Sequence, residues 1–93
     1  MNTMVKAELE VTNPKGIHAR PSAMIVETAQ SLKSDVRLSL NGETVDAANI
    51  MDVLSLGAAQ GAMITVTADG PDEEAALQRM QEIFTLNFND DAD

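Results

Sequence analysis

The segment 16–23 reads GIHARPSA and contains the only histidine of the chain, His18, followed two residues later by Arg20. Upstream, the run 13–16 (NPKG) consists of turn-forming residues that end a strand. Downstream, Pro21 is tolerated in a first helical turn because the N–H that it lacks would have no partner within the helix. His18 is therefore predicted to lie where a helix begins.

This arrangement suits a histidine that carries a phosphoryl group. The first N–H groups of a helix are unpaired and lie at the positive end of the helix dipole, so they attract anions and disfavour imidazolium. Arg20 adds a permanently charged, planar set of donors for phosphate oxygens, and Gly16 lets the backbone turn freely and leaves the approach to the ring open. We expect a neutral His18 ring to be the nucleophile and the N–H groups of Ala19 and Arg20 to hold the phosphoryl group.

Other chemistries find little support in the sequence. No carboxylate stands beside the motif as a general base, no serine has the partners of a nucleophile, and a zinc site would need several more nitrogen or sulfur ligands. We therefore expect no metal site and no bound cofactor. A lone histidine is often a plain surface or core residue, so an α+β interaction domain with an incidental His18 is one alternative. The neighbouring Arg20 counts against that alternative, because a pure scaffold does not need the pair.

The composition predicts a single domain over residues 1–93, with residues 1–3 and 89–93 as frayed ends. Of the 93 residues 44% are hydrophobic, which is enough for one core in a globular protein. Phe84 and Phe88 are the only aromatic residues, so that core must be built from aliphatic side chains.

The charge and the absence of targeting signals limit the partners. A net charge of −9 argues against binding to nucleic acid or to anionic membranes, both of which need basic patches. The chain contains no cysteine, and no apolar run resembles a signal peptide or a membrane-spanning segment. We expect a cytoplasmic monomer without membrane insertion. Met1 and Met4 are both candidate start residues.

Hydrophobic periodicity places seven elements along the chain. Strands show alternation with a period of two, and helices show apolar residues three and four positions apart. Asn41-Gly42 is a strong hairpin signal, and Gly57 can close a helix in the left-handed conformation. The predicted elements are a strand over 5–11, a helix over 19–32, strands over 36–40 and 43–46, a helix over 48–56, a strand over 62–68 and a helix that starts at Pro71 or Asp72.

The resulting order, β-α-β-β-α-β-α, favours an α+β fold. A single antiparallel sheet with helices covering one face is the simplest way to bury the apolar stripes. The side chains predicted to face the core on the helices and the last strand are Ser22, Ile25, Val26, Ala29, Leu32, Val53, Leu56, Ile64, Val66, Ala68, Ala76, Met80, Ile83 and Phe84.

Two segments and the element order resemble a known family. The run GIHARP at 16–21, and NIMDVLSLG at 49–57 followed by Gln60-Gly61, are similar to HPr, the histidine phosphocarrier of the bacterial phosphoenolpyruvate-dependent phosphotransferase system. The resemblance covers about residues 4–88. It implies an open-faced β-sandwich, in which a four-stranded antiparallel sheet is covered on one face by three helices.

The resemblance also implies a role for the histidine. His18 would accept a phosphoryl group through Nδ1 from phospho-enzyme I and pass it to an enzyme IIA domain. Arg20 would steady the group, and the backbone N–H groups of Ala19 and Arg20 would form its cradle. Such a protein is a stoichiometric carrier that forms a phosphohistidine intermediate and is not an enzyme.

A docking surface is expected beside the histidine. On the first predicted helix, Met24 and Glu27 point outward. On the second, the residues alone leave open whether Ile50, Met51 and Leu54 belong to the core or to a surface patch. The resemblance favours the patch, because in HPr this helix docks both enzyme I and the acceptors.

Two departures from the HPr pattern leave the pathway open. Asn49 occupies the position of the regulatory serine of many Gram-positive HPr proteins, has no hydroxyl to phosphorylate, and is expected to cap the helix instead. Asp52 and Glu27 place acid where sugar-system HPr proteins commonly have basic residues, which weakens the attraction to an acidic acceptor. These features and the ending 84–93 also resemble NPr, the nitrogen-related phosphocarrier. Sugar uptake, nitrogen-related regulation, and a binding module for regulatory proteins that is switched by phosphorylation of His18 are the alternatives.

Overall fold

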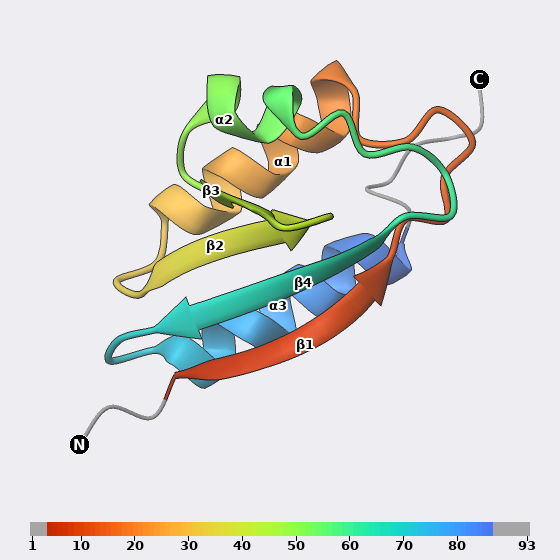
Figure 1. The fold of residues 1–93 in the computed structure, drawn as a ribbon. Helices are drawn as coiled ribbons and strands as arrows, with labels where there is room; N and C mark the ends of the chain where they lie inside the picture. Colours follow the sequence, from red (N-terminus) through yellow and green to blue (C-terminus); the bar gives the residue numbers. More distant parts are fainter. Residues whose placement is uncertain (1–3, 87–93) are drawn as a thin grey trace.

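A computed structural model describes residues 4–86 (Figure 1). Its four strands form one antiparallel sheet in the order β1-β4-β2-β3, and the three helices cover one face of that sheet. The open-faced β-sandwich and the predicted element order are thereby confirmed. The elements are β1 (Val5–Glu10), α1 (Ala19–Gln30), β2 (Asp35–Leu40), β3 (Glu43–Asp46), α2 (Ile50–Ser55), β4 (Met63–Asp69) and α3 (Glu73–Thr85).

The predicted frayed ends, 1–3 and 89–93, lie outside the described residues. Within residues 4–86, no helix has the length and apolar character required to cross a membrane.

The core lies between the sheet and the helices, and the central strand β4 supplies its middle. Ile64, Val66 and Ala68 of β4 are fully buried, as their alternation predicts. In register with them, Leu38 of β2 pairs with Val66, and Leu9 of β1 pairs with Ile64. Fully burying an aliphatic side chain of this size stabilises the folded state by about 1.5–3 kcal/mol, so this layer is the main anchor of the fold.

The hairpin and the last helix follow the predicted pattern with small shifts. Asn41 and Gly42 both have positive φ (53° and 85°), as a two-residue hairpin turn requires. The strand β4 begins and ends one residue later than predicted, and α3 begins at Glu73, after Asp72. Of the predicted stripe on α3, Ile83 is half-buried and packs against the core, while the other three side chains are buried.

Two predicted helices are longer than the observed ones. The prediction that α1 reaches Leu32 is wrong, because the N–H of Ser31 is shared between the carbonyls of Glu27 and Thr28 and the N–H of Leu32 returns to Ala29. This tighter bonding is typical of a helix that ends in a turn. Helix α2 similarly begins at Ile50 instead of residue 48.

Asn49 explains where α2 begins. Its side-chain Oδ1 accepts the backbone N–H groups of Met51 (3.0 Å) and Asp52 (3.2 Å), which is the bonding of a helix N-cap. The predicted capping role of Asn49 is therefore confirmed. Gly57, just beyond the other end of α2, has a φ of 62°, so the left-handed residue expected there is also present.

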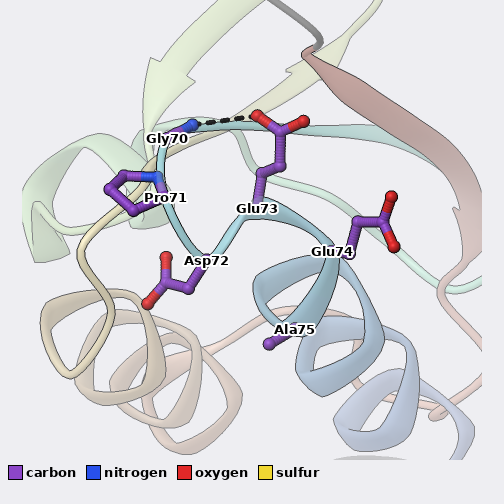
Figure 2. Close-up of a pocket in the computed structure, with 6 residues that line it drawn as sticks. All are labelled: Gly70, Pro71, Asp72, Glu73, Glu74 and Ala75. Atoms are coloured by element: carbon purple, nitrogen blue, oxygen red, sulfur yellow. Dashed lines mark hydrogen bonds between the residues drawn. The ribbon is translucent and has the colours of Figure 1, made fainter.

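The start of α3 is tied to the turn that follows α1. The carboxylate of Asp72 accepts the backbone N–H of Lys33 (2.9 Å) and the hydroxyl of Ser34 (2.5 Å). These bonds, led by the one from Lys33, hold the pKa of Asp72 below its ordinary value. Figure 2 shows that the neighbouring Glu73 points the other way, toward the backbone N–H of Gly70, from which it accepts a bond of 3.0 Å.

We expect this tie to make stability depend on pH in the acid range. Because folding lowers the pKa of Asp72, its contribution is present above the pKa of the unfolded carboxyl, about 4, and is lost as the pH falls through the lower folded value. Thermal unfolding of the wild type and of Asp72→Asn between about pH 7 and pH 2.5 checks this. The wild type should melt higher at neutral pH and converge on the variant in acid. A difference that is constant with pH would contradict the role of the carboxylate.

Candidate functional site

His18 is the residue immediately before α1, which confirms its predicted place at the start of a helix. Its backbone is extended (φ −100°, ψ −155°), and its carbonyl accepts the N–H of Ser22 at 2.9 Å, the first bond of the helix. The imidazole is half-buried and does not cap the helix. His18 is therefore partly accessible to solvent at the N-terminal end of α1.

The first turn of α1 offers two backbone donors. Within residues 4–86, the N–H groups of Ala19 and Arg20 have no protein acceptor. Pro21 lies in this turn, as predicted, and has no N–H to offer; its side chain is buried. The turn carries no acidic side chain, so the positive end of the helix dipole is not neutralised there. Two donors and a positive dipole end are the features of a helix terminus that binds an anion.

Arg20 carries a guanidinium that is available to an anion. Its side chain is exposed and, in the described part of the chain, forms no ion pair. Arg37 is different, because its Nε lies 3.1 Å from a carboxylate oxygen of Asp35, and this hydrogen bond raises the pKa of Arg37. Arg37 would have to give up its bond to Asp35 before it could bind a phosphoryl group. Arg20 has no such bond within residues 4–86.

Gly16 does more than provide a free turn. Its φ of +71° fits the predicted free turn, but the residue does not stand in open space. A Cβ atom at this position would lie 2.4 Å from the carbonyl oxygen of Ala58 and 2.9 Å from the Cα of Ala59. The next residue, Ile17, donates its N–H to the same Ala58 oxygen at 2.9 Å. Gly16 is thus required for the close approach of two backbone segments.

These segments, 11–17 before His18 and 57–62 after α2, are here called the paired loops, and Figure 1 shows them running together. The N–H of Val11 donates to Ala62 (2.9 Å), and the N–H of Gly61 returns a bond to Val11 (2.7 Å). The side chain of Gln60 donates to the carbonyl of Thr12 at 3.1 Å. Sequence reasoning missed this pairing, although Gln60-Gly61 already belonged to the pattern that resembles HPr.

Asn13 was also missed. Its neighbours in sequence predict one residue of a turn, yet Asn13 is fully buried. Its side-chain Nδ2 donates to the carbonyl of Gly16, and its Oδ1 has no partner in the described part of the chain. Turn composition alone contains no signal that distinguishes a buried asparagine from an exposed one.

The three apolar residues of α2 whose location the sequence leaves open lie on the surface and not in the core. Ile50, Met51 and Leu54 expose 38%, 70% and 40% of their surface, whereas Val53 is fully buried. We call the three exposed side chains the α2 patch. The helix also contacts α1, and the side chain of Gln30 on α1 donates to the carbonyl of Ala48, two residues before α2, at 3.1 Å.

On α1, the two side chains predicted to point outward differ. Glu27 is exposed, as expected. While its role as a partner contact stays a prediction, Met24 is half-buried and packs against the core, so it is less exposed than predicted. The reason is that Met24 directly precedes the buried pair Ile25 and Val26 and lies at the edge of the apolar stripe.

The sheet is open on one side, and His18 stands at the start of a helix that covers the other side. Comparison with known proteins gives the family to which this arrangement belongs. The family model described as "PTS HPr component phosphorylation site" matches residues 5–85. The phosphocarrier protein HPr of Xylella fastidiosa strain Temecula1 is 44% identical over 88 residues, which cover 95% of this chain and 99% of that protein.

Solved structures agree. HPr of Thermoanaerobacter tengcongensis superimposes with a TM-score of 0.90 at 32% identity, covering 94% of this chain and 98% of that one. HPr of Bacillus anthracis gives a TM-score of 0.83 at 37% identity, covering 87% and 96%. The chain therefore belongs to the HPr family, whose members are phosphocarriers of the phosphotransferase system and not catalysts.

Proposed function

We propose that this protein carries a phosphoryl group on Nδ1 of His18, taking it from phospho-enzyme I and giving it to an enzyme IIA-type acceptor. The observation that carries the proposal is the place of the only histidine, at an N-terminal helix end. Within residues 4–86, this end has two unpaired N–H groups, and the arginine that follows has no carboxylate partner. Membership of the HPr family supplies the class of donor and acceptor.

In the first transfer, the lone pair of Nδ1 of His18 attacks the phosphorus atom that phospho-enzyme I carries. A new N–P bond forms on His18 while the bond between phosphorus and the donor atom of enzyme I breaks, and that bonding electron pair returns to the donor atom. The N–H groups of Ala19 and Arg20 and the guanidinium of Arg20 hold the phosphoryl oxygens during the transfer. In the second transfer, the nucleophile of the acceptor attacks the phosphorus atom on His18, the N–P bond breaks, and its electron pair returns to Nδ1.

The test is to incubate the protein with phosphoenolpyruvate and enzyme I and to measure the phosphate that it acquires. A phosphohistidine is labile in acid and stable in base, which distinguishes it from a phosphoserine or phosphothreonine. We expect about one phosphoryl group per chain, because the chain has one histidine. A wild-type protein that acquires no label would overturn the proposal.

The acidic residues near the docking surface favour one branch of the family. Glu27 is exposed on α1, and Asp52 lies half-buried on α2 beside the α2 patch. Like charges across an interface slow association, so these two residues disfavour an acidic acceptor. We propose a cytoplasmic, monomeric carrier that serves a nitrogen-related or regulatory acceptor in preference to an acidic sugar-specific one. Asn49 at the cap of α2 gives no hydroxyl for control by phosphorylation.

Arg20→Ala is expected to slow transfer without unfolding the protein. The side chain is exposed and has no ion-pair partner within residues 4–86, so its loss removes no internal contact of that kind. A hydrogen bond to a charged group is worth about 1.5–3 kcal/mol, which corresponds to a rate lower by about 10- to 100-fold. Rapid-quench transfer from phospho-enzyme I measures the effect, and Arg37→Ala on the sheet is the matched control. An unchanged rate would remove Arg20 from the site.

Met51→Glu is expected to weaken docking and leave the fold intact. We infer that the α2 patch contacts the partners, and a carboxylate at its most exposed side chain would have to be desolvated in the complex. The KM of this protein as a substrate of enzyme I should rise by about tenfold or more, while its melting temperature stays close to that of the wild type.

Met4→Glu is the matched control for this substitution. Met4 is 55% exposed and directly precedes β1, at the sheet edge opposite β3, against which α2 packs. Its KM should equal that of the wild type. Equal effects of the two substitutions would contradict the assignment of the α2 patch, and a Met51 variant that melts early would show that Met51 belongs to the core.

A further inference from the structure

We propose that Asn13 is a positioning residue for phosphoryl transfer: its buried amide closes the turn that presents His18 to the donor and acceptor. This inference rests on the proposed function and adds a residue to it. Asn13 lies five positions before His18 and cannot reach solvent, so it acts through the backbone and touches neither partner.

Two hydrogen bonds in opposite directions join Asn13 to Gly16. The side-chain Nδ2 of Asn13 donates to the carbonyl of Gly16 at 2.5 Å, and the N–H of Gly16 donates to the carbonyl of Asn13 at 3.0 Å. The orientation of the amide is determined by this contact, because turning it over would place Oδ1 against the Gly16 oxygen, and both are acceptors. The turn 13–16 is therefore a closed ring with a donor that only the amide group supplies.

The closed turn determines where the next residues go. Gly16 leads into Ile17, which is buried and donates its N–H to Ala58 at 2.9 Å. His18 follows directly, so hydrogen bonds fix the backbone at Gly16 and Ile17, the two residues before His18. A displacement of about 1 Å in a reacting group can lower a rate by about 100-fold, and loss of the Asn13 bond would loosen this stretch of backbone.

The chemistry of the buried amide indicates more than packing. Its Oδ1 has no hydrogen-bond partner in the described part of the chain, and burial of an unpaired polar atom costs about 1–3 kcal/mol. An apolar side chain would fill the same space without that penalty. What an apolar side chain cannot supply is the Nδ2 donor to Gly16, and this donor is the feature we assign to positioning.

Ser22 provides a matched control. It is also fully buried, lies one helical turn after His18, and its Oγ likewise has no partner in the described part of the chain. Unlike Asn13, its side chain makes no bond to the turn. Ser22→Ala therefore removes a buried polar atom from the same neighbourhood and leaves the turn 13–16 closed.

The experiment compares the wild type, Asn13→Ala, Asn13→Asp and Ser22→Ala, all as full chains. Steady-state transfer from phospho-enzyme I, with the carrier as varied substrate, gives kcat and KM. We expect Asn13→Ala to lower kcat by about tenfold with KM unchanged, because the α2 patch is intact. Asn13→Asp, which has the size of asparagine but cannot donate when ionised, should lower kcat at least as far, and Ser22→Ala should stay within about twofold of the wild type.

Amide hydrogen exchange supplies a readout that does not depend on transfer. In Asn13→Ala, the amides of Gly16 and Ile17 should exchange faster, while the amide of Val66 in the central strand should keep its wild-type protection. This pattern shows local loosening of the turn as opposed to global unfolding.

Each result decides the question. A kcat of Asn13→Ala within about twofold of the wild type overturns the inference. A lower kcat that is accompanied by faster exchange at Val66 also overturns the inference, because Asn13 would then serve only the stability of the fold. If Asn13→Ala does not fold, Asn13→Asp decides by its kcat. If the wild type itself accepts no phosphoryl group, the proposed function fails, and exchange at Gly16 and Ile17 still reports whether Asn13 closes the turn.

Discussion

Replacement of His18 with alanine is expected to abolish the transfer of phosphate from phosphoenzyme I to this protein. The chain has no second histidine that could take over. The imidazole is half-buried and does not cap α1, so the variant should fold, with a free energy of unfolding within about 1 kcal/mol of the wild type. The measurement uses phosphoenolpyruvate labelled on phosphorus, followed by treatment of the product with acid and with base.

Two results would contradict this expectation. Equal labelling of His18→Ala and the wild type would show that another residue accepts the group, and a label stable in acid would indicate a hydroxyl acceptor. Arg20→Ala is the matched control for the site, because it should retain an acid-labile label that forms more slowly. We expect Arg20→Ala to be labelled more slowly and His18→Ala not to be labelled at all. This difference would identify His18 as the acceptor and Arg20 as the residue that assists transfer.

Among glycine-to-alanine substitutions in the paired loops, Gly16→Ala is expected to lower the free energy of unfolding most. The residue has a positive φ, which costs a non-glycine residue about 1–2 kcal/mol. In addition, the new Cβ would lie 2.4 Å from the oxygen of Ala58, which is backbone and cannot rotate away. We expect the free energy of unfolding to fall by about 3 kcal/mol or more, as measured by denaturant titration.

Gly57→Ala provides the comparison. Gly57 also has a positive φ of 62°, yet a Cβ there would meet nothing within 4 Å. The loss should be about 1–2 kcal/mol, from the backbone conformation alone. Equal losses for the two variants would mean that the contact between Gly16 and the segment 57–62 contributes nothing. A slower phosphoryl transfer in Gly16→Ala that still folds would link this contact to the site as well.

The parts of the fold that depend on neighbours in sequence were predictable. Alternation along β4 identified Ile64, Val66 and Ala68 as buried, and Asn41-Gly42 identified the hairpin. His18 at a helix start was predictable for the same reason, since the turn residues, the proline and the helical periodicity all lie within a few residues of it.

The parts that depend on distant contacts were not predictable from the residues. A helix as short as α2 has apolar residues on most sides, so only the packing of α1 and β3 decides that Val53 is buried and Met51 is exposed. In the sequence Asn13 looks like any turn residue, yet in the fold it is fully buried. Helix ends differ by one or two residues because side chains such as those of Asn49 and Ser31 compete for the terminal backbone groups.

The pairing of the two loops limits how this protein can change over evolution. The N–H of Val11 donates to Ala62, the N–H of Gly61 donates to Val11, and the N–H of Ile17 donates to Ala58, and these bonds place the two segments in a fixed register. An inserted or deleted residue in either segment would shift that register and move His18 relative to α2. New partners can therefore be accommodated by substitutions on the exposed side chains of α2, but not by a change in loop length. Diversity among such carriers should lie in surface chemistry, while the spacing between the histidine and the helix stays constant.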